Sequence, residues 1–164
     1  MIIEPRVRQF ICTTAHPYGC YQHVKNEVDY VKEKGKLNSK IKNVLVIGSS
    51  TGYGLSSRIA MAFGLGAKTI GVHYDKEPSN RRTASAGYYN TQAFEALAEE
   101  EGLIAYSVNG DAYAQETKEE VARIIRENLN GETLDVIIYS LASPRRTMED
   151  GTVYTSVIKP IGGT

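Results

Sequence analysis

The chain has 164 residues, with 19 basic and 19 acidic side chains and a formal net charge of zero. A chain of this length builds one domain with a substantial core and is short for two. The charge balance argues against a broad nucleic-acid-binding surface. No stretch reads as a membrane span or a signal peptide. We therefore expect a cytoplasmic, soluble protein without nucleic-acid partners.

Residues 1–40 precede the regular pattern and form an N-terminal extension. Scattered apolar residues predict one or two short strands here: Ile2, Ile3, Val7, Phe10 and Ile11. Valines at spacings of four and three predict a helix over residues 21–34, which Gly35 ends. The only cysteines, Cys12 and Cys20, lack C-x-x-C spacing, and the histidines lack metal-ligand spacing. We expect reduced, partly buried thiols and no metal site.

The most informative stretch is a strand that runs into a glycine-rich turn. Residues 44–47 are apolar, as in a strand buried on both faces, and a helix is expected over residues 55–63. Between them stand Gly48, Ser49, Ser50, Thr51, Gly52, Tyr53 and Gly54. Such a turn directs backbone N–H groups and a helix dipole at one spot, which suits a dinucleotide pyrophosphate. The G-x-x-x-G-x-G spacing is that of short-chain dehydrogenases; a turn without a ligand is the alternative.

A regular alternation of strands and helices follows. Strands are expected over residues 69–74, 104–108 and 134–140, the last continuously buried, and helices over residues 91–101 and 115–129. This order predicts an α/β fold, a Rossmann-like doubly wound parallel sheet with helices on both faces. Residues 41–144 would form the dinucleotide-binding half of this fold.

Ligands of such sheets bind at the carboxyl ends of the strands. Tyr74 and Asp75 follow the second strand, where an acid can accept hydrogen bonds from an adenosine ribose and repel a 2′-phosphate. We therefore expect a preference for NADH over NADPH; a plain turn role is the alternative for Asp75. Asp111, beside Ala112, follows the third strand and suits either the adenine amino group or the start of the next helix.

The fourth strand is followed by Leu141 and Ala142, within a run of small residues that lets the backbone approach a nicotinamide ribose. A methyltransferase that binds S-adenosylmethionine would also use a glycine turn and acids at these positions. The third glycine, Gly54, opens the helix directly and favours a pyrophosphate instead. A non-catalytic nucleotide-binding module is a further alternative.

Five stretches carry a resemblance that is more specific than the glycine turn alone. They are residues 5–8, 16–20, 48–55, 82–90 and 139–146. Together they closely resemble the trans-2-enoyl-CoA reductases, also described as FabV-type enoyl-acyl-carrier-protein reductases, over essentially the whole chain. The resemblance implies NADH-dependent reduction of the carbon–carbon double bond of an enoyl-CoA or enoyl-acyl-carrier-protein thioester in fatty-acid metabolism.

The resemblance also implies the cofactor contacts, position by position. They are Gly48, Ser49, Ser50, Thr51, Gly52, Tyr53, Tyr74, Asp75, Asp111, Ala112, Leu141 and Ala142. Two departures are visible: Asp75 stands where the family usually has Glu, and Tyr88 stands where Trp is common. The first keeps the charge but shortens its reach.

Family members are more than twice this long and use a Tyr with a Lys nine positions later. None of the 11 tyrosines here has that partner, so we assign no catalytic residue. We expect the N-terminal portion of a reductase, inactive alone, in which residues 145–164 begin the substrate and catalytic region. The open edge beside residues 134–140 should favour self-association or pairing with a complementary C-terminal half.

Overall fold

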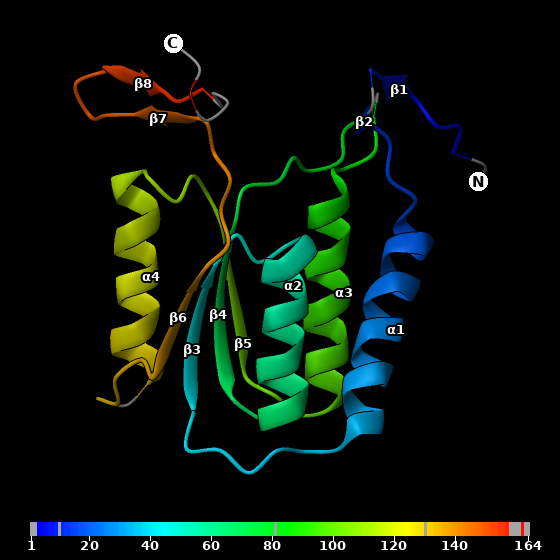
Figure 1. Ribbon diagram of the computed structural model, residues 1–164, viewed down its shortest axis with the longest axis vertical. Coiled ribbons are helices and arrows are strands. Elements are labelled where there is room, and N and C mark those ends of the chain that lie inside the picture. Colours follow the sequence, from blue (N-terminus) through cyan, green and yellow to red (C-terminus); the bar gives the residue numbers. More distant parts are fainter. Residues whose placement is uncertain (1–2, 10, 81, 130, 158–161, 163–164) are drawn as a thin grey trace.

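The centre of the structure is a parallel sheet with the strand order β5–β4–β3–β6 (Figure 1). The computed structural model describes residues 3–9, 11–80, 82–129, 131–157 and 162. The strands are β3 (Asn43–Ile47), β4 (Lys68–His73), β5 (Ala105–Asn109) and β6 (Val136–Tyr139). Within this sheet β3 comes first in the sequence, and β4 and β5 follow on one side of it. The chain then crosses back, and β6 pairs with the other side of β3. Strand order therefore reverses between β3 and β6, the usual place for a ligand.

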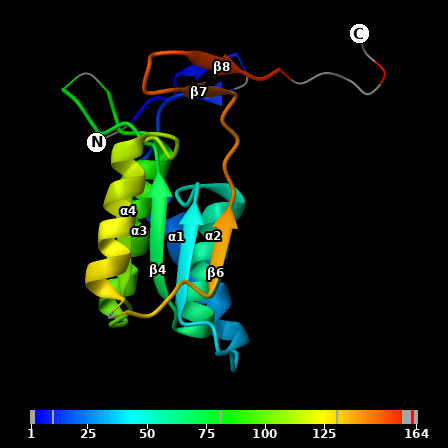
Figure 2. The ribbon, with the colours of Figure 1, turned by 90° about the vertical axis from the view of Figure 1, so that its left-hand side faces the viewer.

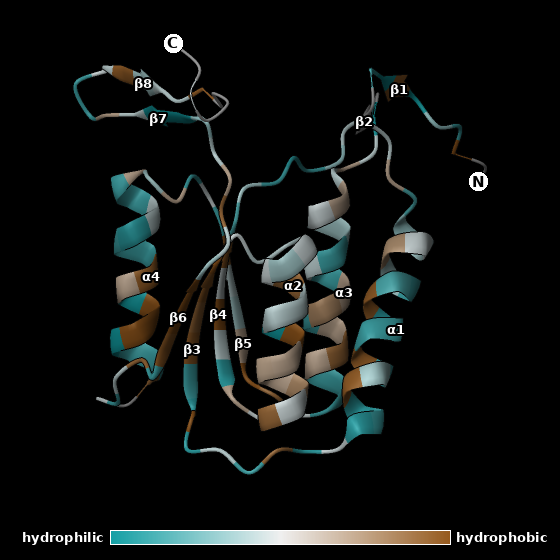
Figure 3. Ribbon diagram, in the orientation of Figure 1, coloured by the Kyte–Doolittle hydropathy of each residue, from teal (hydrophilic) through white to brown (hydrophobic). Residues whose placement is uncertain are grey.

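Helices cover both faces of the sheet (Figures 1 and 2). One face carries α1 (Pro17–Lys34), α2 (Gly52–Ile59) and α3 (Ala86–Glu100), and the other carries α4 (Gln115–Asn128). A π-helical turn, η1 (Ala60–Gly64), continues α2. Apolar residues fill most of β3 and β6, whereas β3 and β4 begin with the polar residues Asn43 and Lys68 (Figure 3). Helix α4 turns its apolar side to the sheet, and α1 packs its apolar side against α2, η1 and α3. The predicted α/β fold with a doubly wound parallel sheet is confirmed.

Three helices begin earlier than the sequence pattern predicts, and one of them, α2, starts at Gly52 rather than at residue 55 because the glycine turn itself forms its first turn. Helix α1 starts at Pro17 rather than at residue 21, because proline suits the first helical position and His16 Nδ1 accepts a hydrogen bond from Gly19 N at 3.3 Å. Helix α3 starts at Ala86 rather than at residue 91. In α1 and α3 the first turn lacks the apolar period by which the rest of the helix was recognised.

Each end of the chain forms a small antiparallel hairpin. Strands β1 (Val7–Arg8) and β2 (Ile11–Cys12) confirm the predicted N-terminal strands, whereas Ile2 and Phe10 lie outside the described residues. Cys12 is exposed, so the expectation of two partly buried thiols is wrong for this residue. The C-terminal hairpin, β7 (Arg145–Thr147) and β8 (Val153–Thr155), was not predicted and stands above the carboxyl ends of the sheet (Figure 2).

The strand predicted to be buried along its whole length, residues 134–140, has one open face. Val136 and Ile138 pack against the core, but Ile137 is 61% exposed and Tyr139 is 59% exposed. Strand β6 pairs only with β3 among the described strands. Helix α4 lies on the face to which Ile137 points, but it packs over β3, β4 and β5 and leaves β6 uncovered. The prediction of complete burial is therefore wrong, because β6 is an edge strand of which only one face is covered.

The tight contact at Gly54 should contribute to the stability of the fold. A Cβ at Gly54 would overlap the carbonyl oxygen of Gly48, so α2 rests on the end of β3 by direct backbone contact. We expect Gly54→Ala to lower the free energy of unfolding by about 3 kcal/mol, the upper range for an overpacked site. Urea unfolding measures this loss.

Gly19→Ala is the matched control, because a Cβ there would meet the His16 Cβ at an ordinary 3.6 Å. Its free energy of unfolding should change by less than about 1 kcal/mol, since alanine is the better helix former. Equal stability of the Gly54→Ala variant and the wild type would contradict this account of the turn.

Candidate functional site

A cleft of about 750 Å³ opens at the carboxyl ends of the strands, where β3, β4, β5 and β6 end. Most of the predicted cofactor residues line it: Gly48, Ser50, Thr51, Tyr74, Asp75, Asp111, Ala112, Leu141 and Ala142. The lining also includes residues that the sequence did not single out: Val72, His73, Gly110, Ser140, Ser143, Pro144, Arg145 and Thr147. Four predicted residues, Ser49, Gly52, Tyr53 and Gly54, are not part of the lining.

The first two residues of the glycine turn are tied to the neighbouring strand. The amides of Gly48 and Ser49 both donate to Val72 O, at 2.8 and 3.0 Å, and Ser49 Oγ donates to the same oxygen at 3.2 Å. Gly48 has a φ of +87°, and a Cβ there would overlap Ser140 O. These two amides therefore hold the turn in place and are not available to a ligand.

The next five amides have no such partner, and two of these residues, Ser50 and Thr51, line the cleft. From Ser50 to Gly54 no backbone N–H has a hydrogen-bond acceptor within the described part of the chain. Thr51 caps α2 with extended backbone and no side-chain hydrogen bond, and Gly52 has a φ of +53° with open space where a Cβ would stand. Free amides and the positive end of a helix form an anion-binding site. Tyr53, 89% exposed, projects away into solvent.

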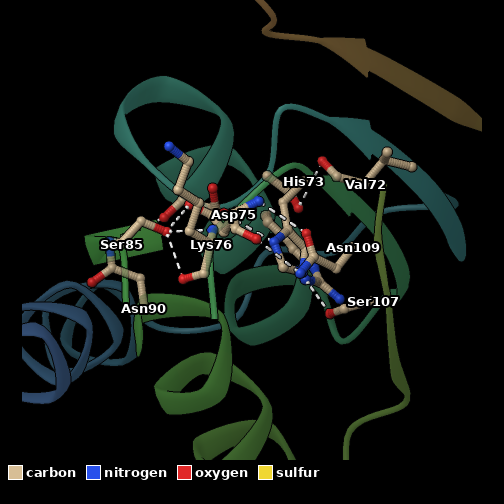
Figure 4. A network of polar contacts seen from close by, with 11 residues as sticks. Val72, His73, Asp75, Lys76, Ser85, Asn90, Ser107 and Asn109 are labelled. Atoms are coloured by element: carbon tan, nitrogen blue, oxygen red, sulfur yellow. Dashed lines mark hydrogen bonds and ion pairs between the residues drawn. The ribbon is translucent and has the colours of Figure 1, made fainter. Parts of the chain in front are cut away.

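Asp75 is the hub of a polar network beside the cleft (Figure 4). Its carboxylate lies 2.9 Å from His73 Nδ1 and accepts a hydrogen bond from Ser85 Oγ at 2.7 Å. Its backbone N–H donates to Asn109 Oδ1 at 2.9 Å, and Asn109 Nδ2 donates back to Asp75 O at 3.1 Å. The side chain is only 10% exposed. The network fixes the carboxylate where β4 ends, which a plain turn residue would not require.

The charge of Asp75 is held by these donors. Burial alone would raise the pKa of its carboxyl group, but hydrogen bonds from His73, Ser85 and Ser50 outweigh burial and bring the pKa below its ordinary value. Gly87, at the start of α3, makes room for the carboxylate, because a Cβ there would overlap both of its oxygens. The carboxylate is therefore a fixed negative charge between the cleft and the start of α3.

Asp111 shapes the loop that leads into α4. Its Oδ1 accepts a hydrogen bond from Tyr113 N at 2.9 Å, and its carbonyl oxygen accepts one from Ala114 N at 2.9 Å. Ala114, and not Asp111, is the N-cap of α4. The residue therefore braces the turn before the helix while it lines the cleft together with Ala112.

Residues 140–145, which follow β6, form another wall of the cleft. Ser140 N donates to Ile47 O at 2.8 Å, which keeps this segment against the end of β3. Tyr139 and Tyr113 share a hydrogen bond between their hydroxyls at 2.9 Å, and this bond raises the pKa of Tyr139. The Arg146 guanidinium lies 5.6 Å from the centre of the Tyr113 ring.

None of the helices in the described ranges is both long and apolar enough to span a bilayer. Among the same residues, no group of three or more His, Cys, Asp or Glu side chains is arranged to hold a metal ion.

A parallel sheet whose order reverses beside a glycine turn, with an acid at the end of the next strand, defines the dinucleotide-binding class of α/β folds. Family models give the particular family. Residues 2–80 match the NAD(P)H-binding domain of trans-2-enoyl-CoA reductase, and residues 82–164 match the trans-2-enoyl-CoA reductase catalytic region. The chain belongs to the trans-2-enoyl-CoA reductase family. Both matched segments contribute strands to the one central sheet.

Individual relatives agree with the family models. An enoyl-[acyl-carrier-protein] reductase [NADH] of Pseudoalteromonas translucida is 53% identical over 99% of this chain and 41% of its own length. A trans-2-enoyl-CoA reductase [NADH] of Ruminiclostridium cellulolyticum is 54% identical over 98% of this chain and 40% of its own. The chain thus spans about two fifths of the length of these curated relatives.

A solved structure shares the fold. The trans-2-enoyl-CoA reductase of Clostridium acetobutulicum, crystallised in complex with NADH, superposes with a TM-score of 0.90 at 40% identity, over 97% of this chain and 40% of that one. The comparisons give the methyltransferase alternative no support.

The lowered pKa of Asp75 predicts a pH-dependent contribution to stability. The contribution is complete above the ordinary carboxyl pKa of 3.8, where the carboxylate is ionised in both the folded and the unfolded chain. Below that pH the unfolded chain takes up the proton first, so the contribution declines until the pH passes the lower pKa of the folded state.

We expect Asp75→Asn to lower the free energy of unfolding at neutral pH and to flatten its decline below about pH 4, the ordinary range for carboxyl titration. Urea titrations of both proteins between neutral pH and pH 2 measure the difference. Parallel curves for variant and wild type would contradict the network's role in holding this charge.

Proposed function

We propose that this chain forms the NADH-binding part of an enoyl-thioester reductase, which reduces trans-2-enoyl-CoA or enoyl-acyl-carrier-protein in fatty-acid metabolism. The observation that carries the proposal is the row of unpaired amides from Ser50 to Gly54, whose first two residues line a cleft at the switch point of the sheet. The relatives named as NADH-dependent reductases, and the neighbour crystallised with NADH, support the choice of cofactor.

The diphosphate would lie on the glycine turn. In this proposal the amides of Ser50, Thr51 and Gly52 bind phosphate oxygens directly, with Tyr53 and Gly54 completing the first turn of the helix. Gly48 and Ser49 position the turn through their hydrogen bonds to Val72 O and leave room for the ligand.

The rest of the dinucleotide would extend to either side of the turn. Tyr74 and Asp75 would hold the adenosine ribose, and Asp111 with Ala112 would border the adenine. Leu141 and Ala142, on the wall formed by residues 140–145, would border the nicotinamide ribose. This assignment divides the chain into an N-terminal extension (residues 1–40), the cofactor half (residues 41–144) and the start of the substrate region (residues 145–164).

The proposed reaction transfers a hydride from NADH and a proton to the two carbons of the double bond. The proton donor is not assigned to this chain, because none of the 11 tyrosines has a Lys nine positions later. Tyr139 is not part of the cleft lining, and its hydroxyl is hydrogen-bonded to that of Tyr113. The cofactor half therefore orients NADH, and the acid would come from a complementary C-terminal half.

The open face of β6 is the surface on which we expect such a half to dock. Ile137 and Tyr139 are exposed side by side on this face, and β6 has an unpaired edge among the described strands. Apolar side chains beside an unpaired strand edge favour pairing with another chain. Self-association through the same edge is the expected behaviour when no complementary half is present.

Cofactor selectivity tests the assignment of Asp75. We expect the wild-type chain to bind NADH at least about tenfold more tightly than NADPH, because like charges near 4 Å cost about 1–4 kcal/mol. Asp75→Asn should reduce that ratio, and Glu77→Gln, which removes an exposed acid outside the cleft, should leave it unchanged. Fluorescence titration of both cofactors measures the ratio. Equal affinity for both, or binding of S-adenosylmethionine in their place, would contradict the proposal.

Turnover tests the proposal that this chain binds NADH while a C-terminal half supplies the proton donor. The chain alone should show no crotonyl-CoA-dependent oxidation of NADH, and activity should appear when the C-terminal part of the R. cellulolyticum relative is co-expressed with it. The same pair carrying Gly48→Val should stay inactive, because a side chain there would overlap Ser140 O. Turnover by the chain alone, or an assembled pair without turnover, would contradict the assignment; the second result favours a non-catalytic module.

A further inference from the structure

A buried arginine lies behind the glycine turn. Arg58, on the side of α2 that faces the sheet, is 1% exposed. Its guanidinium donates to Tyr106 O at 2.6 Å and to Ser107 Oγ at 2.9 Å, and its Nε donates to Thr69 Oγ1 at 3.3 Å. These acceptors are neutral oxygens of β4 and β5.

The positive charge of Arg58 has no direct counter-charge. No carboxylate of the described ranges forms an ion pair with it; Glu95 of α3 acts on it only at longer range. Burial lowers the pKa of the guanidinium to about 10, against the opposing effect of Glu95, so the group is still charged at neutral pH. Below it the Phe94 ring lies 4.3 Å away. A buried charge that is paired only with neutral groups is costly.

The charge lies beside Ser49, the residue before the unpaired amides of the turn. Arg58 follows Gly54 by four residues, one helical turn along the same side of α2. A Cβ added at Gly71 would overlap both the Arg58 guanidinium and Ser49 Oγ, so these two groups are neighbours over the middle of β4. The guanidinium is therefore a neighbour of the second residue of the glycine turn, in an interior where electric fields are weakly screened.

We propose that Arg58 is a positioning residue whose buried charge strengthens the binding of the dinucleotide's diphosphate at the glycine turn. The proposal rests on the function proposed above and adds a group that touches no ligand. A bound diphosphate supplies the negative charge that the guanidinium lacks in the free protein. The attraction acts on the phosphates and not on the adenine or the riboses.

A purely structural role would be different, because the same hydrogen bonds also tie α2 to β5. If Arg58 only kept the helix in place, its loss would displace the turn that binds the diphosphate, and Arg58→Lys would bind NADH equally well at every pH. If its charge acts on the diphosphate, the affinity of Arg58→Lys would fall as the buried lysine loses its proton. Ligands with and without phosphate show which part of the dinucleotide is affected, and the pH profile of Arg58→Lys separates the two roles.

The test compares NADH and ADP-ribose, which carry the diphosphate, with adenosine, which does not. We expect Arg58→Met to bind the first two about tenfold more weakly and adenosine as the wild type does, by NMR titration. Arg58→Lys should retain the affinity at pH 7 but lose it as the pH rises toward 9, because burial lowers the pKa of an amine. Arg126→Met, at an exposed position in the last turn of α4, changes the net charge equally and should have no effect.

Each remaining outcome overturns one specific statement. A wild-type chain that does not bind NADH overturns the proposed function itself. Unchanged affinity of Arg58→Met for ADP-ribose, or an equal loss for ADP-ribose and adenosine, overturns the role of the charge while NADH binding stands. If Arg58→Met does not fold, the pH profile of Arg58→Lys decides, and a profile as flat as that of the wild type overturns the proposal.

Discussion

The cleft depends on one backbone contact, at which the end of β3, the start of α2 and the exit of β6 meet. Gly54 rests on the carbonyl of Gly48, and Gly48 in turn lies against Ser140 O. No side chain could stand at either glycine without moving one of the three elements apart. The contact directs the first turn of α2 toward the carboxyl ends of the strands, so that its amides face open space. A ligand bound there would use backbone groups that the fold itself leaves unpaired.

Two fixed charges surround this turn, and they serve different parts of a dinucleotide. Asp75 is negative, held by His73 and Ser85 at the end of β4, beside the expected position of the adenosine ribose. Arg58 is positive and buried beside Ser49 of the turn. The fold thus places a negative and a positive charge at two sides of the turn, and each is held by hydrogen bonds that a change of ligand would not need to break.

Much of this arrangement could be predicted from local patterns. The apolar runs gave the strands, and the spacing of Gly48, Gly52 and Gly54 gave the turn and its position at the switch point. The network around Asp75 could not be predicted in the same way, because its partners Ser85 and Asn109 lie 10 and 34 residues away in the sequence. The burial of Arg58 was missed because a charged residue in a helix is expected to face solvent.

The hairpin β7–β8 has a signal in the sequence, because Asp150-Gly151 is a dipeptide typical of hairpin turns and Gly151 has a φ of +82°. For the site as a whole, the most direct measurement is the response of the turn's own amides to NADH, by ¹⁵N-resolved NMR of the 164-residue chain. The account predicts the largest shifts at Ser50, Thr51 and Gly52. Shifts confined to residues outside the cleft, with these three amides unmoved at saturation, would contradict it.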